Sequence, residues 1–314
     1  MPTRDKLLPQ LGERLFLTDG GIETTLIFHD GLELPYFAAF HLMREEAGRE
    51  ALVNYYERHI AVAKSAGMGF ILESPTWRAS RDWGHKLGYA DDDVARVNRR
   101  SIGLMQDLRI VHETSMMPMV VSGCVGPRGD GYDPGEIMSE DEAEHYHAHQ
   151  IGAFAAAGAD MTSAITITNV PEAVGIVRAS RAAGLPVAVS FTVETDGRLP
   201  TGEGLGDAIA RVDDATRMAP AYYMINCAHP THFETTLAVD APWIKRLRGV
   251  RANASRMSHA ELNDATELDA GDPVELGEQY GAFRRRQPQI TVLGGCCGTD
   301  HRHIECISRS CDVR

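Results

Sequence analysis

The stretch EALVNYYERHIAVAKSAGMGFILES, residues 50–74, contains the structural unit from which the fold is built. In its first part, apolar residues recur three and four positions apart, which is the spacing of an amphipathic helix. Gly67 follows Ala66, and glycine is a common residue at the end of a helix. The apolar run Gly69–Glu73 comes next and is typical of a buried strand. We therefore predict a helix over Glu50–Ala66 followed by a strand.

The same alternation of short apolar runs and longer helical segments recurs along the rest of the chain. We predict eight strands, at Leu15–Asp19, Gly69–Glu73, Met119–Gly123, Asp160–Thr166, Pro186–Val193, Tyr222–Cys227, Val250–Ala254 and Ile290–Gly295. Further helices are predicted at Asp91–Val111, Ser139–Ala157, Val170–Ala183 and Pro273–Arg286. Eight strand–helix alternations favour the α/β class and a (β/α)8 barrel, the TIM barrel.

An open, doubly wound sheet is the main alternative to a barrel. Dinucleotide-binding sheets of that type carry G-x-G-x-x-G after a strand, whereas the nearest match here, Gly202–Gly206, has the wrong spacing and is interpreted as a loop. The chain has no Ser/Pro/Gly-rich linker and no internal repeat, so we predict a single domain over residues 1–314. The longest irregular stretches, Thr76–Tyr89 and Val125–Met138, follow the second and third strands, where barrels build active sites.

Composition and charge narrow the classes of function. Of 314 residues, 43% are hydrophobic and 24% charged, as in ordinary globular proteins, which excludes a wholly disordered chain. A formal net charge of -13 would repel nucleic acid, and no apolar run reaches the roughly 20 residues that span a bilayer. Residues 1–6 lead into no apolar stretch of signal-peptide length. We expect a cytoplasmic protein that binds small molecules rather than nucleic acid or membrane, and the choice between monomer and homo-oligomer is left open.

Three of the six cysteines lie at the ends of predicted strands. Cys227 ends one strand, and another runs into Cys296 and Cys297. In the reducing cytosol such residues serve as core residues, metal ligands or nucleophiles. Because parallel barrel strands end at one rim, the three thiols are expected around one mouth. Three thiolates suggest zinc (Zn²⁺), and an open fourth position is typical of a catalytic site.

The adjacency of Cys296 and Cys297 is an obstacle to a shared metal, because successive residues of a regular strand point to opposite faces. Gly294, Gly295 and Gly298 flank the pair and permit a sharp turn there. Packed core cysteines and a redox-active cysteine pair are the alternatives to zinc, and residue spacing alone leaves them open.

Five short motifs near the predicted strand ends resemble those of one known family. They are Asp19-Gly20-Gly21, Gly123-Cys124-Val125-Gly126-Pro127, Asp196-Gly197, Asn226-Cys227 and Gly294-Gly295-Cys296-Cys297-Gly298. With these motifs the chain resembles the homocysteine S-methyltransferase family over nearly its whole length. The resemblance implies a (β/α)8 barrel that holds zinc on three catalytic ligands, which are Cys227, Cys296 and Cys297.

The resemblance also implies an activity, the transfer of a methyl group to a thiol, usually homocysteine, to give methionine. Family donors include S-methylmethionine, S-adenosylmethionine and betaine, and this chain is too short to carry separate cobalamin or folate domains. Zinc suits the chemistry, since a free thiol with a pKa near 8.5 is only slightly ionised at pH 7, whereas a metal-bound thiol is deprotonated. A metal-dependent hydrolase and a non-catalytic thiol or zinc sensor are the competing functions.

One departure from the family pattern concerns the ammonium group of the acceptor. Ile165 replaces the glutamate that binds it in relatives, and isoleucine accepts no hydrogen bond. Either another carboxylate takes over, for which Glu73 and Glu194 are candidates, or the acceptor thiol lacks an amino group. A second departure follows Asn253, where the glycine and glutamate usual in the family are absent. The expected substrate-binding residues are Asp19, Gly20, Glu73, Glu194, Asn226 and Asn253.

Two further groups of side chains have both a functional and a structural interpretation. Trp77 and Trp83 lie in the long second loop, where they would form an aromatic wall for a cationic donor or simply pack within the loop. His145, His147 and His149 lie on one predicted helix. No carboxylate accompanies them in a known metal motif, so we expect a solvated helix face there.

Overall fold

Eight parallel strands close into a barrel in which each strand pairs with the next and β8 pairs with β1. The computed structural model describes residues 8–312. The strands are β1 (Phe16–Leu17), β2 (Gly69–Glu73), β3 (Met119–Val125), β4 (Met161–Ile167), β5 (Val187–Phe191), β6 (Tyr222–Asn226), β7 (Leu247–Ala252) and β8 (Val292–Gly295). The predicted barrel and its eight strands are confirmed, with β7 beginning three residues earlier than predicted.

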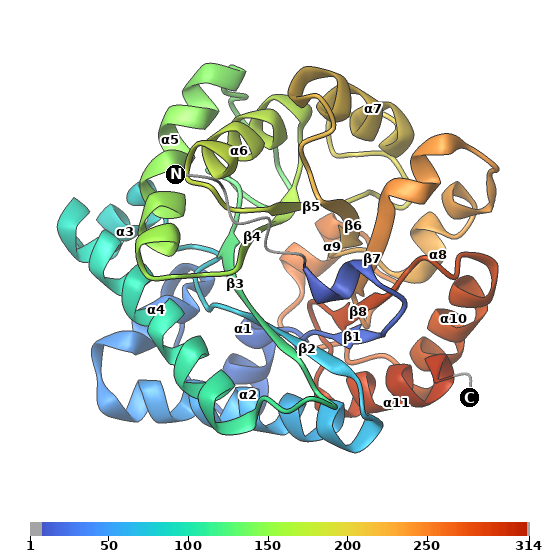
Figure 1. Cartoon of the computed structure of the whole chain (residues 1–314), viewed down its shortest axis with the longest axis horizontal. Helices are drawn as coiled ribbons and strands as arrows, with labels where there is room; N and C mark the ends of the chain where they lie inside the picture. The colour runs from blue at the N-terminus through green and yellow to red at the C-terminus, as the bar shows by residue number, and fades with distance from the viewer. Residues whose placement is uncertain (1–7, 313–314) are drawn as a thin grey trace.

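Helices surround the barrel, as Figure 1 shows. The longer ones are α2 (Glu46–Ala66), α4 (Asp91–His112), α5 (Glu140–Ala156), α6 (Val170–Ala182), α7 (Leu205–Thr216), α10 (Pro273–Arg286) and α11 (His301–Cys311). Short helices are α1 (Ile22–Thr24), α3 (Arg81–Lys86), α8 (Pro230–Phe233) and α9 (His259–Asp264). Tighter or wider helical turns occupy Pro9–Leu11, Thr25–His29, Pro35–Phe37, Ala39–Arg44, Thr236–Ala238 and Pro242–Arg246.

Local sequence signals determine where several helices begin and end. Gly67 ends α2 in the left-handed conformation, with φ 65°, as its position after Ala66 predicts. The Ser139 side chain accepts a hydrogen bond from the Glu142 backbone, and the Glu142 carboxylate accepts one from the Ser139 backbone, which forms a capping box at α5. The interpretation of Gly202–Gly206 as a loop is correct only up to residue 204, because the unpredicted helix α7 begins at Leu205.

The prediction of a solvated histidine face on α5 is correct for His145, which is exposed, and wrong for His147. The buried His147 Nε2 lies 3.0 Å from a carboxylate oxygen of Glu172 on α6. Although burial favours the neutral acid, the hydrogen bond with His147 helps to hold the pKa of Glu172 below its ordinary value. This pair therefore ties α5 to α6.

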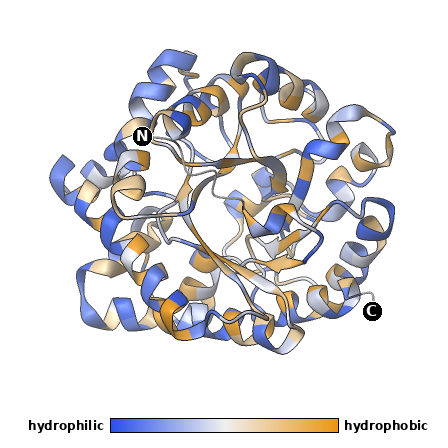
Figure 2. Cartoon of the chain, viewed as in Figure 1, coloured by the Kyte–Doolittle hydropathy of each residue, from blue (hydrophilic) through white to orange (hydrophobic). Residues whose placement is uncertain are grey.

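The apolar core has two parts, because parallel strands in a barrel are buried on both faces. Side chains such as Phe16, Met161 and Tyr222 fill the inside of the barrel. A larger cluster lies between the strands and the helices and includes Phe70 and Phe154. Figure 2 shows the corresponding pattern, with apolar strands at the centre and polar residues toward the outside of the helices.

The structure bears on the expected absence of a membrane span and of a leader, and on the domain bounds, only for the residues that it describes. No helix between residues 8 and 312 combines the length and apolar character that crossing a bilayer demands. The start of the chain, where no leader was expected, lies outside the described residues. The predicted domain over residues 1–314 can be described only as the barrel built by residues 8–312.

Candidate metal and substrate site

The three cysteines at the strand ends lie together at the rim of the barrel. Cys227 follows β6, and Cys296 and Cys297 follow β8. The three sulfur atoms all lie within 4.8 Å of one another, and those of Cys227 and Cys297 are 3.6 Å apart. Across residues 8–312, no other set of three cysteine, histidine or acidic side chains is spaced to hold a metal ion. The arrangement offers one metal ion three sulfur ligands.

Strand β7 brings the two cysteine segments together, because it lies between β6 and β8. The Cys227 backbone N–H donates to the carbonyl of Arg251, and the Cys296 N–H donates to that of Ala252, at 3.1 and 2.8 Å. The last two residues of β7 therefore hold the two cysteine segments side by side. Cys227 has φ 57°, a conformation that is uncommon for a residue with a side chain, so the chain turns sharply as soon as β6 ends.

A turn beyond β8 lets adjacent cysteines share the cluster. The strand ends at Gly295, so the alternation of side chains between the two faces no longer applies to Cys296 and Cys297. A Cβ atom on Gly295 would lie 2.0 Å from the Thr299 hydroxyl, so only glycine fits there. That hydroxyl donates a hydrogen bond of 2.7 Å to the Cys296 carbonyl and holds the turn closed.

The charge states of the three thiols depend on one another. Hydrogen bonds with Cys227 and Cys297 hold the pKa of Cys296 well below its ordinary value, and the nearby Arg251 guanidinium lowers it further. Hydrogen bonding with its two neighbours, followed by burial, raises the pKa of Cys227 well above its ordinary value. The three thiols therefore do not ionise independently, and a bound cation would favour the ionised form of all three.

Tyr132, which was not among the predicted site residues, covers this cluster from the long loop after β3. Its hydroxyl lies 3.2 Å from the Cys227 sulfur and 3.6 Å from the Cys297 sulfur. Its ring stacks on His259 of α9, with centroids 4.1 Å apart and an angle of 11°. His259 in turn lies 2.7 Å from the Cys227 carbonyl and 2.9 Å from the carboxylate of Glu194. Glu194 is thus engaged by His259 and does not line the cavity described below.

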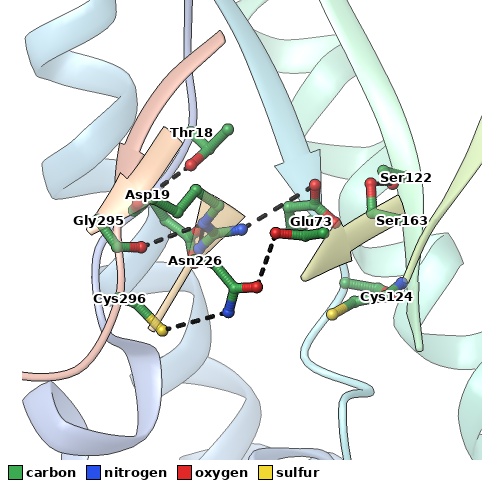
Figure 3. A network of polar contacts seen from close by, with 12 residues as sticks. Thr18, Asp19, Glu73, Ser122, Cys124, Ser163, Asn226, Gly295 and Cys296 are labelled. Carbon is green, nitrogen blue, oxygen red and sulfur yellow. Dashed lines mark hydrogen bonds and ion pairs between the residues drawn. The ribbon is translucent and has the colours of Figure 1, made fainter. Parts of the chain in front are cut away.

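A buried ion pair forms the polar floor beside the cysteines. Arg251 donates to the Asp19 carboxylate at 2.7 Å and to the Gly295 carbonyl at 3.1 Å. Tyr55 donates to the other oxygen of Asp19 at 3.0 Å. Figure 3 shows Asp19 and Glu73 among the side chains that gather at the strand ends. The Asp19 carboxylate is therefore already paired, with only 2% of the residue exposed.

Glu73 lies in the same floor, but one of its two carboxylate oxygens lacks a hydrogen-bond partner among the described residues. One of its oxygens is 4.0 Å from the Arg251 guanidinium, and the other is buried without a hydrogen-bond partner among the described residues. Burial raises the pKa of Glu73 to about 7, against the attraction of Arg251. A buried carboxylate oxygen without a partner is costly, so this group is suited to a ligand that brings a hydrogen-bond donor.

Three further predicted substrate-binding residues, Asn226, Asn253 and Gly20, differ in their contacts. Asn226 donates to the Thr166 hydroxyl at 2.7 Å and approaches the Cys296 sulfur at 3.8 Å (Figure 3), so it links β4 to the cluster. The side-chain oxygen of Asn253 is buried without a partner among the described residues. The Gly20 backbone N–H donates to His59 Nε2 at 3.2 Å. Of these three, only Gly20 lines the cavity.

A cavity of about 380 Å³ opens beside the cysteine cluster at the carboxyl ends of the strands. Among the predicted site residues, its lining includes Asp19, Gly20, Glu73, Cys227, Cys296 and Cys297. Ile165 and Cys124 also line it, as does Glu23, a residue that sequence reasoning missed. Burial raises the pKa of Glu23 to about 8. The cavity thus combines a thiol cluster with carboxyl groups.

The expected aromatic wall for a cationic donor is largely occupied by the protein itself. The Arg78 guanidinium lies 4.3 Å from the Trp77 ring centre and 3.8 Å from that of Trp83. The Lys86 ammonium lies 3.8 Å from the centre of the same Trp83 ring. Trp83 does not line the cavity, whereas Trp77 does. Of the two interpretations, packing within the loop is the one that fits Trp83, because Arg78 and Lys86 already make its cation–π contacts.

A closed (β/α)8 barrel with a cysteine-lined cavity at the carboxyl ends of its strands defines a barrel enzyme with a thiol site. The chain belongs to the homocysteine S-methyltransferase family, whose model matches residues 16–311. This match confirms the family that the strand-end motifs indicated and, with it, the enzyme class, a methyltransferase.

Individual relatives agree with this family. The chain is 25% identical over 199 residues to the homocysteine S-methyltransferase YbgG of Bacillus subtilis (strain 168), a match that spans 59% of each protein. The oxidised form of the homocysteine methyltransferase MmuM from Escherichia coli superimposes with a TM-score of 0.73, at 18% identity, over 95% of this chain and 96% of that one. Its metallated form gives 0.69 at the same identity and coverage. At this identity the two structures support the fold.

Proposed function

We propose that this protein is a zinc-dependent S-methyltransferase that moves a methyl group from a small sulfonium or ammonium donor to homocysteine, giving methionine. The candidate donors are S-methylmethionine, S-adenosylmethionine and betaine. The observation that carries the proposal is the set of three sulfurs within 4.8 Å of one another at the edge of an open cavity. Membership of the homocysteine S-methyltransferase family supports it.

The cysteine cluster suits zinc by donor type and by spacing. In a tetrahedral site with Zn–S distances of about 2.3 Å, two ligand sulfurs lie roughly 3.8 Å apart. The 3.6 Å between the Cys227 and Cys297 sulfurs is close to that value. The existence of a metallated form of E. coli MmuM is consistent with a metal in this family. When bound, zinc would supply the acidity that keeps a substrate thiol deprotonated at neutral pH.

The chain's own residues would position the acceptor and support the ligands. We assign acceptor binding to Asp19, Gly20 and Glu73, because they line the cavity next to the cysteines. Asn226 would orient Cys296 through their contact of 3.8 Å. Glu194 would act through His259, which it holds against the backbone of Cys227.

Asn253 does not line the cavity, so its proposed role is to support the cysteine site rather than to line it. Its backbone N–H donates to the Ala228 carbonyl, one residue beyond Cys227. Its buried side-chain oxygen has no partner among the described residues. We assign it to the support of the Cys227 turn, and a substrate or water donor would satisfy the free oxygen.

The acidic character of the cavity favours a cationic donor. Six carboxyl groups line it against two arginines, and Asp130, Glu267 and Asp269 remain beside those near the cysteines. A sulfonium or ammonium donor brings a positive charge to this surface and loses it when the methyl group leaves. Ile165 lies in the same lining, which keeps a thiol other than homocysteine as the alternative acceptor.

The reduced thiols that this chemistry needs support a cytoplasmic location. We propose that the partners are the thiol and the methyl donor alone, without nucleic acid or membrane. The net charge of -13 supports the first of these exclusions.

The test is a product analysis with the zinc-loaded protein. Homocysteine would be incubated with each of the three donors carrying an isotopically labelled methyl group, and products would be identified by mass spectrometry. We expect labelled methionine from at least one donor, and none from protein stripped of metal by a chelator. Absence of methyl transfer to any thiol, or undiminished transfer by the metal-free protein, would refute the proposal.

A further inference from the structure

Glu23 is the most unusual acidic residue in the cavity. It lies in α1, directly after the Asp19-Gly20-Gly21 turn, and lines the cavity next to the cysteine cluster. Its carboxyl group is hydrogen-bonded to its own backbone and, within residues 8–312, makes no hydrogen bond or ion pair with another residue. The side-chain charges that act on it are those of Cys296, Asp19 and Arg78, so it lies among groups from several sides of the cavity.

Glu73 supplies a second carboxyl group that is only partly satisfied, although the Ser163 and Ser122 hydroxyls help to hold it. The residue is 4% exposed, it lines the cavity, and its Oε2 has no partner among the described residues. Its Oε1 is 4.0 Å from Arg251, which is too long for a hydrogen bond. Two carboxyl groups without a hydrogen-bonded cation, Glu23 in α1 and Glu73 at the end of β2, therefore line one cavity, and one oxygen of Glu73 has no partner among the described residues.

The positive charges of the cavity are already matched. Arg251 is paired with Asp19 at 2.7 Å, and Arg78 with Asp130 at 3.3 Å. Both arginines in the cavity lining thus have a nearer carboxylate partner, whereas Glu73 reaches Arg251 only at 4.0 Å and Glu23 pairs with neither. A cation with hydrogen-bond donors would complete this cavity and favour the ionised form of both carboxyl groups, and a thiol without an amino group brings no such cation.

The position of the two carboxyl groups points to the acceptor rather than to the donor. The acceptor sulfur must reach Cys227, Cys296 and Cys297, and the ammonium of a short α-aminothiol lies only a few bonds from that sulfur. Glu23 is close enough to Cys296 for the charge of that thiol to act on its carboxyl group. Glu73 lies 4.0 Å from Arg251, and the Arg251 guanidinium donates to the carbonyl of Gly295, the residue before Cys296. A cation held between them is therefore near the cluster.

We propose that Glu23, together with Glu73, binds the ammonium group of an α-aminothiol acceptor and so replaces the carboxylate that is missing at Ile165. The inference rests on the proposed function as a thiol methyltransferase and narrows its acceptor to thiols that carry an amino group. Isoleucine at position 165 then contributes apolar contact only, and acceptor specificity comes from the β1 and β2 side of the barrel.

Binding of two matched thiols tests this role without any methyl donor. Zinc-loaded protein would be titrated calorimetrically with homocysteine and with 4-mercaptobutanoate, which lacks the amino group. We expect wild-type protein to bind homocysteine about 10- to 100-fold more tightly, as for a hydrogen bond to a charged group. Glu23→Gln should lose most of that preference and leave 4-mercaptobutanoate binding unchanged, and Glu73→Gln should act in the same direction.

Controls separate the proposed role from structural damage. Glu267→Gln changes an exposed acid on the same cavity lining and should keep the full preference for homocysteine. Ile165→Glu in the Glu23→Gln background should restore part of it. Zinc content and thermal unfolding of each variant should match wild type, because glutamine keeps the size of glutamate.

The outcomes that contradict the inference differ from those that contradict the proposed function. Equal binding of the two thiols by wild type, or an equal loss for both in Glu23→Gln, would overturn the inference while methyl transfer could still occur. A defect of Glu23→Gln confined to donor binding would also overturn it, since the carboxyl group would then serve the donor. Failure of wild-type protein to bind either thiol or to methylate any thiol would overturn the proposed function.

Discussion

At the scale of single residues, the buried pair of Arg251 and Asp19 supports the cavity floor. Asp19 accepts hydrogen bonds from both Arg251 and Tyr55, so its carboxylate is held in one orientation. Such a pair adds little net stability, but removing one partner strands a buried charge on the other. The floor therefore depends on both charges being present.

Asp19→Asn is expected to destabilise the protein by about 3 kcal/mol, because it removes the hydrogen-bonded counter-ion of Arg251 and leaves only Glu73 at 4.0 Å. Urea unfolding at neutral pH measures this loss. Asp107→Asn removes one partner of an exposed pair, 3.3 Å from Arg49, and should cost less than about 1 kcal/mol. Equal stabilities of the two variants would contradict the role given to the floor.

His59 links stability to pH because it is buried and hydrogen-bonded to two backbone groups. Its Nδ1–H donates to the Tyr55 carbonyl at 2.9 Å, and its Nε2 accepts the Gly20 N–H, so the ring is neutral in the folded protein. Burial lowers the pKa of His59 to about 4 from an ordinary value of 6.5. Between these values the unfolded chain binds more protons, so this contribution to stability is present above pH 6.5 and is lost as the pH falls toward 4.

We expect His59→Gln to lose less stability than wild type between pH 6.5 and 4, by on the order of 2 to 3 kcal/mol. Chemical unfolding at several pH values measures the difference. His145→Gln changes an exposed histidine and should leave the wild-type pH profile intact. Parallel profiles for wild type and His59→Gln would show that His59 does not titrate in this way.

At the scale of elements, the turn between β8 and α11 is the feature that makes the cluster possible. It turns two adjacent cysteines toward one metal position, and it does so only because Gly295 leaves room for Thr299. Gly295→Ala should displace the turn and lower the zinc content well below one per chain in a protein that remains folded. Metal analysis with circular dichroism measures both properties.

Gly103→Ala is the matched control for that substitution. Gly103 lies within α4, and an added Cβ would meet nothing within 4 Å. This variant should keep its zinc and gain about 0.5 to 1 kcal/mol of stability, since alanine is the better helix former. Normal zinc binding by Gly295→Ala would mean that the glycine is not required for the shared site.

The elements differ in how well the sequence predicts them, for physical reasons. The eight strands are continuous apolar runs because both of their faces are buried, so a single sequence reveals them. β7 begins at Leu247. The prediction placed its start too late because Arg248 and Gly249 interrupt the apolar run. The helix α7 follows a glycine-rich loop without a side-chain cap, and no local signal marks its start.

At the scale of the whole molecule, the candidate site combines segments that only the closed barrel brings together. The three cysteines were predicted because thiols of this kind at strand ends have few roles in a reducing compartment. Tyr132 was missed because it lies in a loop without a recognisable motif, and His259 because the start of α9 gives no sign of its neighbours; only tertiary folding stacks their rings. Glu23 was missed because its significance depends on lacking a partner, which is a property of the folded protein.

The central claim is that Cys227, Cys296 and Cys297 hold one zinc ion whose fourth position receives the acceptor sulfur. Zinc K-edge X-ray absorption of the zinc-loaded protein, with and without homocysteine, tests it most directly. We predict three sulfur scatterers at about 2.3 Å and one lighter atom in the free protein, and four sulfurs after homocysteine is added. Fewer than three sulfurs in the free protein, or a spectrum unchanged by the thiol, would contradict the claim.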